Sequence, residues 1–184
     1  MRVFIALSIS SSIKEKIAEI QKRLKEREDK VRWVNPGIIH LTLKFLGEIR
    51  EEKLKEVFKA VERVARESSP FLMNIEGMGL FPNFSRPRII WVGVREEEEK
   101  LQSLVSSLEK ELKREGFPEE KREWRPHLTV GRIKFLKERE KLMDFIQLER
   151  EKRFGEEKVR DIQIMESRLT PGGPIYTVLK RVLL

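Results

Sequence analysis

The sequence predicts a single domain of mixed strands and helices, arranged as two related lobes around a shared core. The spacing of its apolar residues follows the order strand, helix, strand, helix, strand, and this order occurs twice along the chain. Each occurrence spans about 90 residues, which is too long for a solenoid repeat and suits two pseudo-symmetric lobes. The 184 residues, 39% of them hydrophobic, are enough to bury such a core. We therefore expect one domain over residues 1–184, with approximate repeat units 1–87 and 88–184.

The first unit opens with an apolar segment that is followed by serines. The serines at positions 10–12 can cap a helix N-terminus, and the apolar residues after them recur every three or four positions. The Asn-Pro-Gly sequence within residues 31–37 favours a turn-rich connection, and Gly47 ends the strand that follows it. We expect strands at residues 2–7, 38–46 and 71–79, and helices at residues 10–30 and 51–67.

The second unit repeats this order after a loop that contains two prolines. Four glutamates at 96–99 fit the acidic first turn of a helix, where the helix dipole favours negative charge. The Pro-Gly-Gly-Pro turn at 171–174 joins the last two strands as a hairpin with a longer loop. We expect strands at residues 88–94, 124–134, 158–168 and 175–183, and helices at residues 96–115 and 137–150.

The composition narrows the possible classes of protein. Because the chain has no cysteine, disulfides, thiolate zinc sites and a cysteine nucleophile are excluded. The apolar start, Met1 to Leu7, is too short for a signal peptide, and no apolar run approaches the roughly 20 residues that span a membrane. We expect a soluble, cytoplasmic protein without a membrane partner.

Charge is abundant and unbalanced. Charged residues make up 38% of the chain, which resembles the ion-pair-rich surfaces of proteins from hot environments. The net charge of +8 favours polyanionic partners such as nucleic acid through long-range attraction. A solvated surface with surplus lysine explains the same numbers, so charge alone leaves both interpretations open.

The chain has two histidines, His40 and His127, and both begin the same tetrapeptide, His-Leu-Thr-aliphatic. With four threonines in the chain, chance would produce this coincidence on the order of once in a million. In a strand, residues i and i+2 share a face, so Thr42 projects with His40 and Thr129 projects with His127. Lobes related by a pseudo-two-fold axis would bring the two pairs together across a cleft.

Paired histidines suit the cleavage of a phosphodiester. A histidine has an ordinary pKa of about 6.5, so one imidazole can accept a proton from water while the other donates one to the departing oxygen. The threonine hydroxyls can bind phosphate oxygens, and an arginine can stabilise the charge of the transition state. Arg125 has the same strand parity as His127, whereas Arg132 reaches the site only if Gly131 kinks or bulges the strand.

The paired motifs and the repeat resemble the two-histidine (2H) phosphoesterase superfamily, specifically the RNA 2′,3′-cyclic phosphodiesterases also called 2′-5′ RNA ligases. The matching segments are Arg2-Val3-Phe4-Ile5-Ala6-Leu7, the Trp33-Val34 approach to His40, His40-Leu41-Thr42-Leu43-Lys44-Phe45-Leu46-Gly47, and Arg125-Pro126-His127-Leu128-Thr129-Val130-Gly131-Arg132. The resemblance implies a bilobal α+β fold, with two antiparallel sheets flanking a basic cleft and helices outside. It also implies metal-independent opening of a 2′,3′-cyclic phosphate to a 2′-phosphomonoester.

The resemblance further implies roles for individual residues. His40 matches the proton donor to the leaving O3′, and His127 matches the proton acceptor that activates water. Thr42, Thr129 and Arg132 match positions that hold phosphate, and Phe45 matches an aromatic that stacks on the terminal base. Strand parity alone puts Phe45 on the core side, so plain packing is a rival interpretation. Three tryptophans, at 33, 91 and 124, are expected in the core or the cleft wall, and Tyr176 is a candidate for lining the cleft.

Other functions stay open at this stage. The same motifs fit a 2′-5′ RNA ligase that joins 2′,3′-cyclic phosphate and 5′-hydroxyl ends, for instance of tRNA halves, and the basic charge fits a non-catalytic RNA-binding protein. Two histidines are too few for a metal site, no His-Glu-x-x-His motif or P-loop is present, and we expect no metal or cofactor. The expected partner is RNA with 2′,3′-cyclic phosphate ends; no obligate protein partner is expected, and a monomer is the default.

Overall fold

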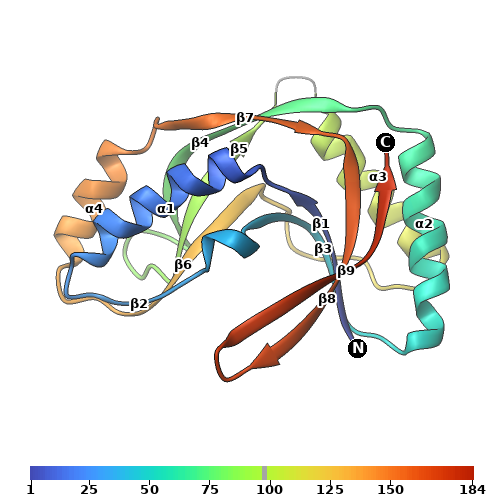
Figure 1. Ribbon diagram of the computed structural model, residues 1–184, viewed down its shortest axis with the longest axis horizontal. Coiled ribbons are helices and arrows are strands. Elements are labelled where there is room, and N and C mark those ends of the chain that lie inside the picture. Colours follow the sequence, from blue (N-terminus) through green and yellow to red (C-terminus); the bar gives the residue numbers. More distant parts are fainter. Residues whose placement is uncertain (97–98) are drawn as a thin grey trace.

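Two antiparallel sheets form the framework, and the helices lie outside them (Figure 1). The computed structural model describes residues 1–96 and 99–184. The first half contains β1 (Arg2–Ser8), α1 (Ser11–Lys25), β2 (Lys30–Trp33), the 3-10 turn η1 (Pro36–Ile38), β3 (His40–Glu48), η2 (Glu51–Lys53), α2 (Leu54–Arg66) and β4 (Phe71–Phe81). The second half contains β5 (Ile89–Arg95), α3 (Lys100–Arg114), β6 (His127–Phe135), α4 (Arg139–Leu148), β7 (Arg153–Val159), β8 (Asp161–Thr170) and β9 (Gly173–Leu183).

The sheets have the orders β3-β1-β8-β9 and β2-β6-β5-β4-β7. Helices α2 and α3 pack against the four-stranded sheet, and α1 and α4 pack against the five-stranded sheet, so the two helix pairs lie at opposite ends of the molecule in Figure 1. This arrangement agrees with the α+β fold expected from the sequence. Within the described residues, no helix is both long and apolar enough to cross a membrane.

The two sheets do not coincide with the two repeat units. The four-stranded sheet takes β1 and β3 from the first unit and β8 and β9 from the end of the chain. The five-stranded sheet takes β2 and β4 from the first unit and its other strands from the second. One apolar core of buried residues, such as Ile5, Leu41 and Leu128, continues through both halves. The lobes are therefore interlaced rather than stacked end to end.

Several element boundaries differ from the sequence-based prediction. Helix α1 ends at Lys25 rather than at residue 30, and residue 30 together with residues 31–33, expected in a turn-rich connection, forms the edge strand β2. Strand β7 was not predicted, and the β8–β9 hairpin has a tight turn because Thr170 already pairs with Gly173. Helix α3 begins at Lys100, and the Glu96 carboxylate accepts hydrogen bonds from its first backbone N–H groups. Glutamates 97 and 98 of the predicted acidic turn lie outside the described residues.

Candidate active site

The two histidines occupy equivalent positions at the first residues of β3 and β6. These strands belong to different sheets and contact each other. A cavity of about 1020 Å³ lies between them. All six residues that the sequence singled out for the site line this cavity, namely His40, Thr42, Phe45, His127, Thr129 and Arg132. The pairing of the motifs across one cleft therefore agrees with the expectation from the repeat.

Each histidine is held by the same local hydrogen bond. The Nδ1 atom of His40 lies 2.8 Å from the carbonyl oxygen of Ile38, and Nδ1 of His127 lies 2.7 Å from that of Arg125. Because a carbonyl oxygen only accepts, Nδ1 carries the hydrogen in both rings. The other nitrogen, Nε2, then has a free lone pair in the neutral ring and can exchange a proton with a bound molecule.

The surroundings favour the neutral form of both imidazoles. Burial lowers the pKa of His40 below 6.5, the hydrogen bond to Ile38 opposes this, and the charge of Lys14 lowers it further. Burial also lowers the pKa of His127, the hydrogen bond to Arg125 opposes it, and the charge of Arg132 adds to the lowering. An anion bound between the rings would reverse part of both shifts, since it favours the imidazolium form.

A β-bulge in β3 brings Phe45 to the cavity. Ile5 of β1 pairs with Lys44, but the next residue, Ala6, pairs with Thr42, so one residue of β3 is left over. The two consecutive residues Leu43 and Lys44 are both buried, and Phe45 is 69% exposed. The core-packing interpretation of Phe45 is therefore wrong, because the bulge reverses the strand parity on which it was based.

The same irregularity recurs in β6. Ile90 of β5 pairs with Gly131, and Trp91 pairs with Thr129, which leaves Val130 as the extra residue. Val130 and Gly131 are both buried, and Arg132 emerges on the face of His127. The bulge that Arg132 needed is thus present. Phe45 and Arg132 each follow their histidine by five positions, so they occupy equivalent places in the two halves.

Aromatic rings pack against both histidines, and sequence reasoning named only one of them, Tyr176, as a candidate for the cleft. The ring of Phe4 lies 4.9 Å from that of His40, and Tyr176 packs edge-on against His40 at 5.2 Å. Phe81 packs edge-on against His127 at 5.0 Å. Tyr176 was a candidate on the sequence, whereas Phe4 lies in an unbroken apolar run that has no periodicity to indicate its face. These contacts restrict the orientations of the two imidazoles.

Other predicted residues lie at the rim. Arg125 lines the cavity; its side chain is 65% exposed and pairs with Glu123 at 2.9 Å, and its backbone carbonyl is bonded to His127. Trp124 forms part of the wall and donates from Nε1 to the backbone oxygen of Thr42. Trp33 packs against the core, and Trp91 packs at 5.1 Å against Phe81.

A buried ion pair stabilises the wall of the cavity near the segment that precedes His127. The Lys44 ammonium lies 2.7 Å from both carboxylate oxygens of Glu109 on α3, and it donates to the backbone oxygen of Pro118 at 2.8 Å. Lys44 comes from the bulge of β3, while Pro118 belongs to the connection between α3 and β6. Lys44 therefore joins the strand of one histidine to α3 by the ion pair and to the segment that precedes the other histidine by the hydrogen bond.

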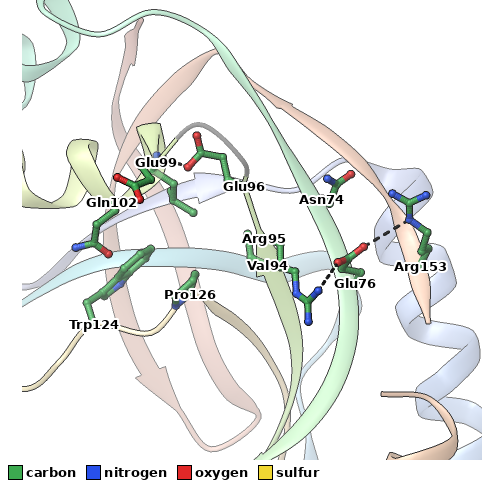
Figure 2. A pocket seen from close by; sticks show the side chains of 11 residues that line it. Asn74, Glu76, Val94, Arg95, Glu96, Glu99, Gln102, Trp124, Pro126 and Arg153 are labelled. Atoms are coloured by element: carbon green, nitrogen blue, oxygen red, sulfur yellow. Dashed lines mark hydrogen bonds and ion pairs between the residues drawn. The ribbon is translucent and has the colours of Figure 1, made fainter. Parts of the chain in front are cut away.

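A second cavity, of about 490 Å³, meets the first at Trp124 and Gln102. Figure 2 shows Glu76 in it between Arg95 and Arg153, with ion pairs of 3.3 and 3.5 Å. The carboxylate is thus neutralised, and neither histidine lines this cavity. Among the described residues, no three His, Asp or Glu side chains come together as a metal site would need. Both histidines line the first cavity.

Comparisons with known proteins agree with this geometry. The family described as LigT like Phosphoesterase matches the chain twice, over residues 7–91 and 92–176, which confirms the internal repeat. A protein of Archaeoglobus fulgidus named RNA 2′,3′-cyclic phosphodiesterase is 41% identical, with 98% of both chains covered. A protein of the same name from Methanocaldococcus jannaschii is 38% identical, covering 98% of this chain and 99% of the relative.

Solved structures show the same fold. A crystal structure of a protein from Thermus thermophilus superposes with a TM-score of 0.83 at 28% identity, covering 100% of this chain and 98% of that one. Escherichia coli LigT in complex with 3′-AMP superposes with a TM-score of 0.78 at 26% identity, covering 100% of this chain and 97% of that one.

Proposed function

The chain belongs to the LigT-like phosphoesterase family, and we propose on that basis that it hydrolyses the 2′,3′-cyclic phosphate end of an RNA to a 2′-phosphomonoester. The observation that carries the proposal is the pair of His-Leu-Thr motifs on one cavity, each imidazole anchored through Nδ1 with Nε2 left for proton transfer. Relatives that match over nearly the whole chain carry the name of this activity.

In the proposed reaction, Nε2 of His127 takes a proton from a water molecule as that water attacks the phosphorus. The bond between phosphorus and O3′ breaks, and His40, protonated at Nε2, gives its proton to the departing O3′. The products are a 2′-phosphate and a 3′-hydroxyl, so one water molecule is consumed. The assignment of His127 as base and His40 as acid rests on the match of their motifs to the family, since a nearby cation favours the neutral imidazole in both cases.

Substrate binding is assigned to the residues around the histidines. The hydroxyls of Thr42 and Thr129 and the guanidinium of Arg132 are proposed to bind the non-bridging phosphate oxygens, where they stabilise the developing charge. Phe45 is proposed to stack on the terminal base, in keeping with its exposed ring on the cavity. Both histidines come from one chain, and we propose that residues 1–184 act as a single bilobal unit that needs no second copy.

The test is the conversion of a short RNA with a 2′,3′-cyclic phosphate end by wild type, His40→Ala and His127→Ala. We expect wild type to form the 2′-phosphate and each variant to lose about 10²–10⁴ in rate. Lys55→Ala, on the exposed side of α2, serves as the surface control. Wild-type rates in both histidine variants would overturn the proposal and support a non-catalytic RNA-binding protein.

The same assay separates hydrolysis from ligation. The two reactions share the cyclic phosphate and the histidines, and they differ in whether water or a 5′-hydroxyl attacks. With excess 5′-hydroxyl RNA present, we expect the 2′-phosphate to remain the main product, since water is the more abundant nucleophile. A predominant 2′-5′ linked product would assign the chain to the ligase direction instead.

A further inference from the structure

We propose that the exposed face of the β2–β6 edge binds the RNA strand upstream of the cyclic phosphate, so that the enzyme prefers an RNA chain to a cyclic mononucleotide. This inference rests on the proposed function and adds a second binding region to it. The region, called the β2–β6 track below, consists of Arg32, Lys30, Lys134 and Phe135. None of these residues lines the histidine cavity.

Strand pairing puts the track on the same face as the histidines. Arg32 of β2 pairs directly with Arg132 of β6, and paired residues of neighbouring strands point to the same side of a sheet. Arg132 lines the histidine cavity. On the opposite side, Val31 pairs with Ile133, and both contribute to the apolar core. Arg32 therefore extends the surface of the cavity toward the edge of the sheet.

The next residues along both strands continue this surface. Lys30 pairs with Phe135, and the register changes at this point, so Lys134 is the extra residue of a further bulge. Lys30 and Lys134 are exposed, and the ring of Phe135 is 56% exposed. An exposed aromatic ring among cations is the combination that binds single-stranded nucleic acid, because bases stack on the ring and the cations attract phosphates.

The two ends of the cleft differ in charge. At the α3 end, two of the cations that line the cavity are paired with carboxylates: Lys113 pairs with Glu119 at 3.0 Å, and Arg125 pairs with Glu123 at 2.9 Å. In the track, no carboxylate of residues 1–96 and 99–184 forms an ion pair with Arg32, Lys30 or Lys134. A polyanion that is bound at the histidines and extends toward β2 therefore meets cations that have no carboxylate partner among the described residues.

Neighbouring elements set the limits of the track. A Cβ atom on Gly173, at the tip of the β8–β9 hairpin, would lie 3.8 Å from Nη2 of Arg32, so the hairpin borders the start of the track. In Figure 1 the hairpin projects away from its sheet on the side where β2 lies. At the far end, Glu28 binds Lys137, and Asp29 accepts hydrogen bonds from the backbone N–H groups of residues 137 and 138.

The length of the track fits a short stretch of RNA. Seven residues of β6 lie between His127 and Phe135, and at the strand rise of about 3.3 Å per residue these two residues are roughly 25 Å apart. A cyclic mononucleotide bound at the histidines cannot reach Lys30 or Phe135. An oligonucleotide whose cyclic end lies at the histidines can, and it gains the phosphate contacts and the stacking interaction.

The test compares a cyclic mononucleotide with a hexanucleotide that ends in the same 2′,3′-cyclic phosphate. At low salt, we expect the kcat/KM of wild type to be about tenfold higher, or more, for the hexanucleotide than for the mononucleotide. This is the increase expected from the stacking of one base. The variants Arg32→Gln, Phe135→Ala and the double variant Lys30→Gln with Lys134→Gln should each lower this ratio, by about tenfold for the loss of the stacked base. The double variant should also weaken the dependence of log kcat/KM on log salt by about 0.7 for each cation removed.

Arg66→Gln and Lys55→Gln, exposed on α2, are the matched controls and should leave the ratio at its wild-type value. Equal kcat/KM for the two substrates in wild type, or equal losses in the track and control variants, would overturn the inference. Inactivity of wild type toward both substrates would instead contradict the proposed function. In that case the affinity for a hexanucleotide with a 2′-phosphate end, measured by fluorescence anisotropy, still tests the track, because the track variants must bind it more weakly than the controls.

Discussion

His40 and His127 form the same local hydrogen bond, from Nδ1 to the carbonyl oxygen of the residue two positions earlier. This bond selects the tautomer, and its acceptor is a backbone atom rather than a side chain. The same hydrogen bond raises each pKa, while burial and one nearby cation lower it.

The lowered pKa values predict an acidic optimum for the free enzyme. The base His127 must be neutral, so kcat/KM falls as the pH drops through the pKa of His127. The acid His40 must be protonated, so kcat/KM falls as the pH rises through the pKa of His40. Because both pKa values lie below 6.5, the maximum of kcat/KM should lie below 6.5. The bound phosphate raises both pKa values, so the kcat profile should lie at higher pH. Steady-state kinetics across the pH range tests this, and a kcat/KM maximum well above 6.5 would contradict it.

Arg132 should affect both the rate and the pH profile. In Arg132→Gln we expect kcat to fall by about 10²-fold, as for the loss of one donor to a developing oxyanion. The pKa of His127 should rise, because the charge of Arg132 contributes to lowering it, and the acidic limb of kcat/KM should move to higher pH. Arg125→Gln removes a cation whose side chain is paired with Glu123, and it should leave that limb in place.

At the scale of elements, the two bulges decide which side chains reach the substrate. Gly131 has no room for a side chain, since a Cβ there would lie 2.8 Å from Val31 and 3.1 Å from the ring of Trp33. Gly131→Ala should therefore push β2 away from β6 and destabilise the fold by about 1–3 kcal/mol. Thermal unfolding measures the effect. Gly172→Ala, whose nearest neighbouring atom lies 3.8 Å away, should unfold as wild type does.

The ion pair between Lys44 and Glu109 is the second element-scale feature that can be tested. The Lys44 side chain is 4% exposed, so Glu109→Gln leaves a buried ammonium without its counter-charge. We expect a loss of about 3 kcal/mol in the free energy of unfolding, the lower end for breaking a buried pair, because Glu109 keeps some access to water. Denaturant unfolding measures it. Glu119→Gln breaks the exposed pair with Lys113 and should cost less than about 1 kcal/mol.

These elements also show what the sequence can and cannot reveal. The long amphipathic helices and the motif strands follow from periodicity, and the pairing of His40 with His127 follows from the repeat. The face of β3 on which Phe45 lies cannot be predicted in this way, because the bulge that determines it depends on how β1 pairs with β3. Strand β2 is four residues long, and β7 is mostly charged with Phe154 and Val159 buried, so tertiary pairing, rather than local pattern, makes them strands.

At the scale of the whole molecule, the cleft exists only because two sheets from interlaced halves face each other. The groups proposed to react in the cleft are nitrogen and oxygen atoms of side chains. In the described part of the chain, no three metal-ligating residues form a cluster. The proposed hydrolysis should therefore proceed at an unchanged rate in excess EDTA. Activity that is lost to the chelator and restored by a divalent cation would contradict the two-histidine mechanism.

The interlacing has a consequence for how the chain folds. Strand β1 lies between β3 and β8, so Val3 pairs both with Gly47 and with Glu166, which is much more distant in the sequence. Contacts between residues so far apart in the sequence slow folding, since a long loop must close before they form. On the ribosome, β1 and β3 emerge early, but Tyr176, which packs against His40, arrives with the last strand. The cleft that holds both histidines is thus completed only after β9 has paired with β8, and we expect no activity of a nascent chain on RNA before that step.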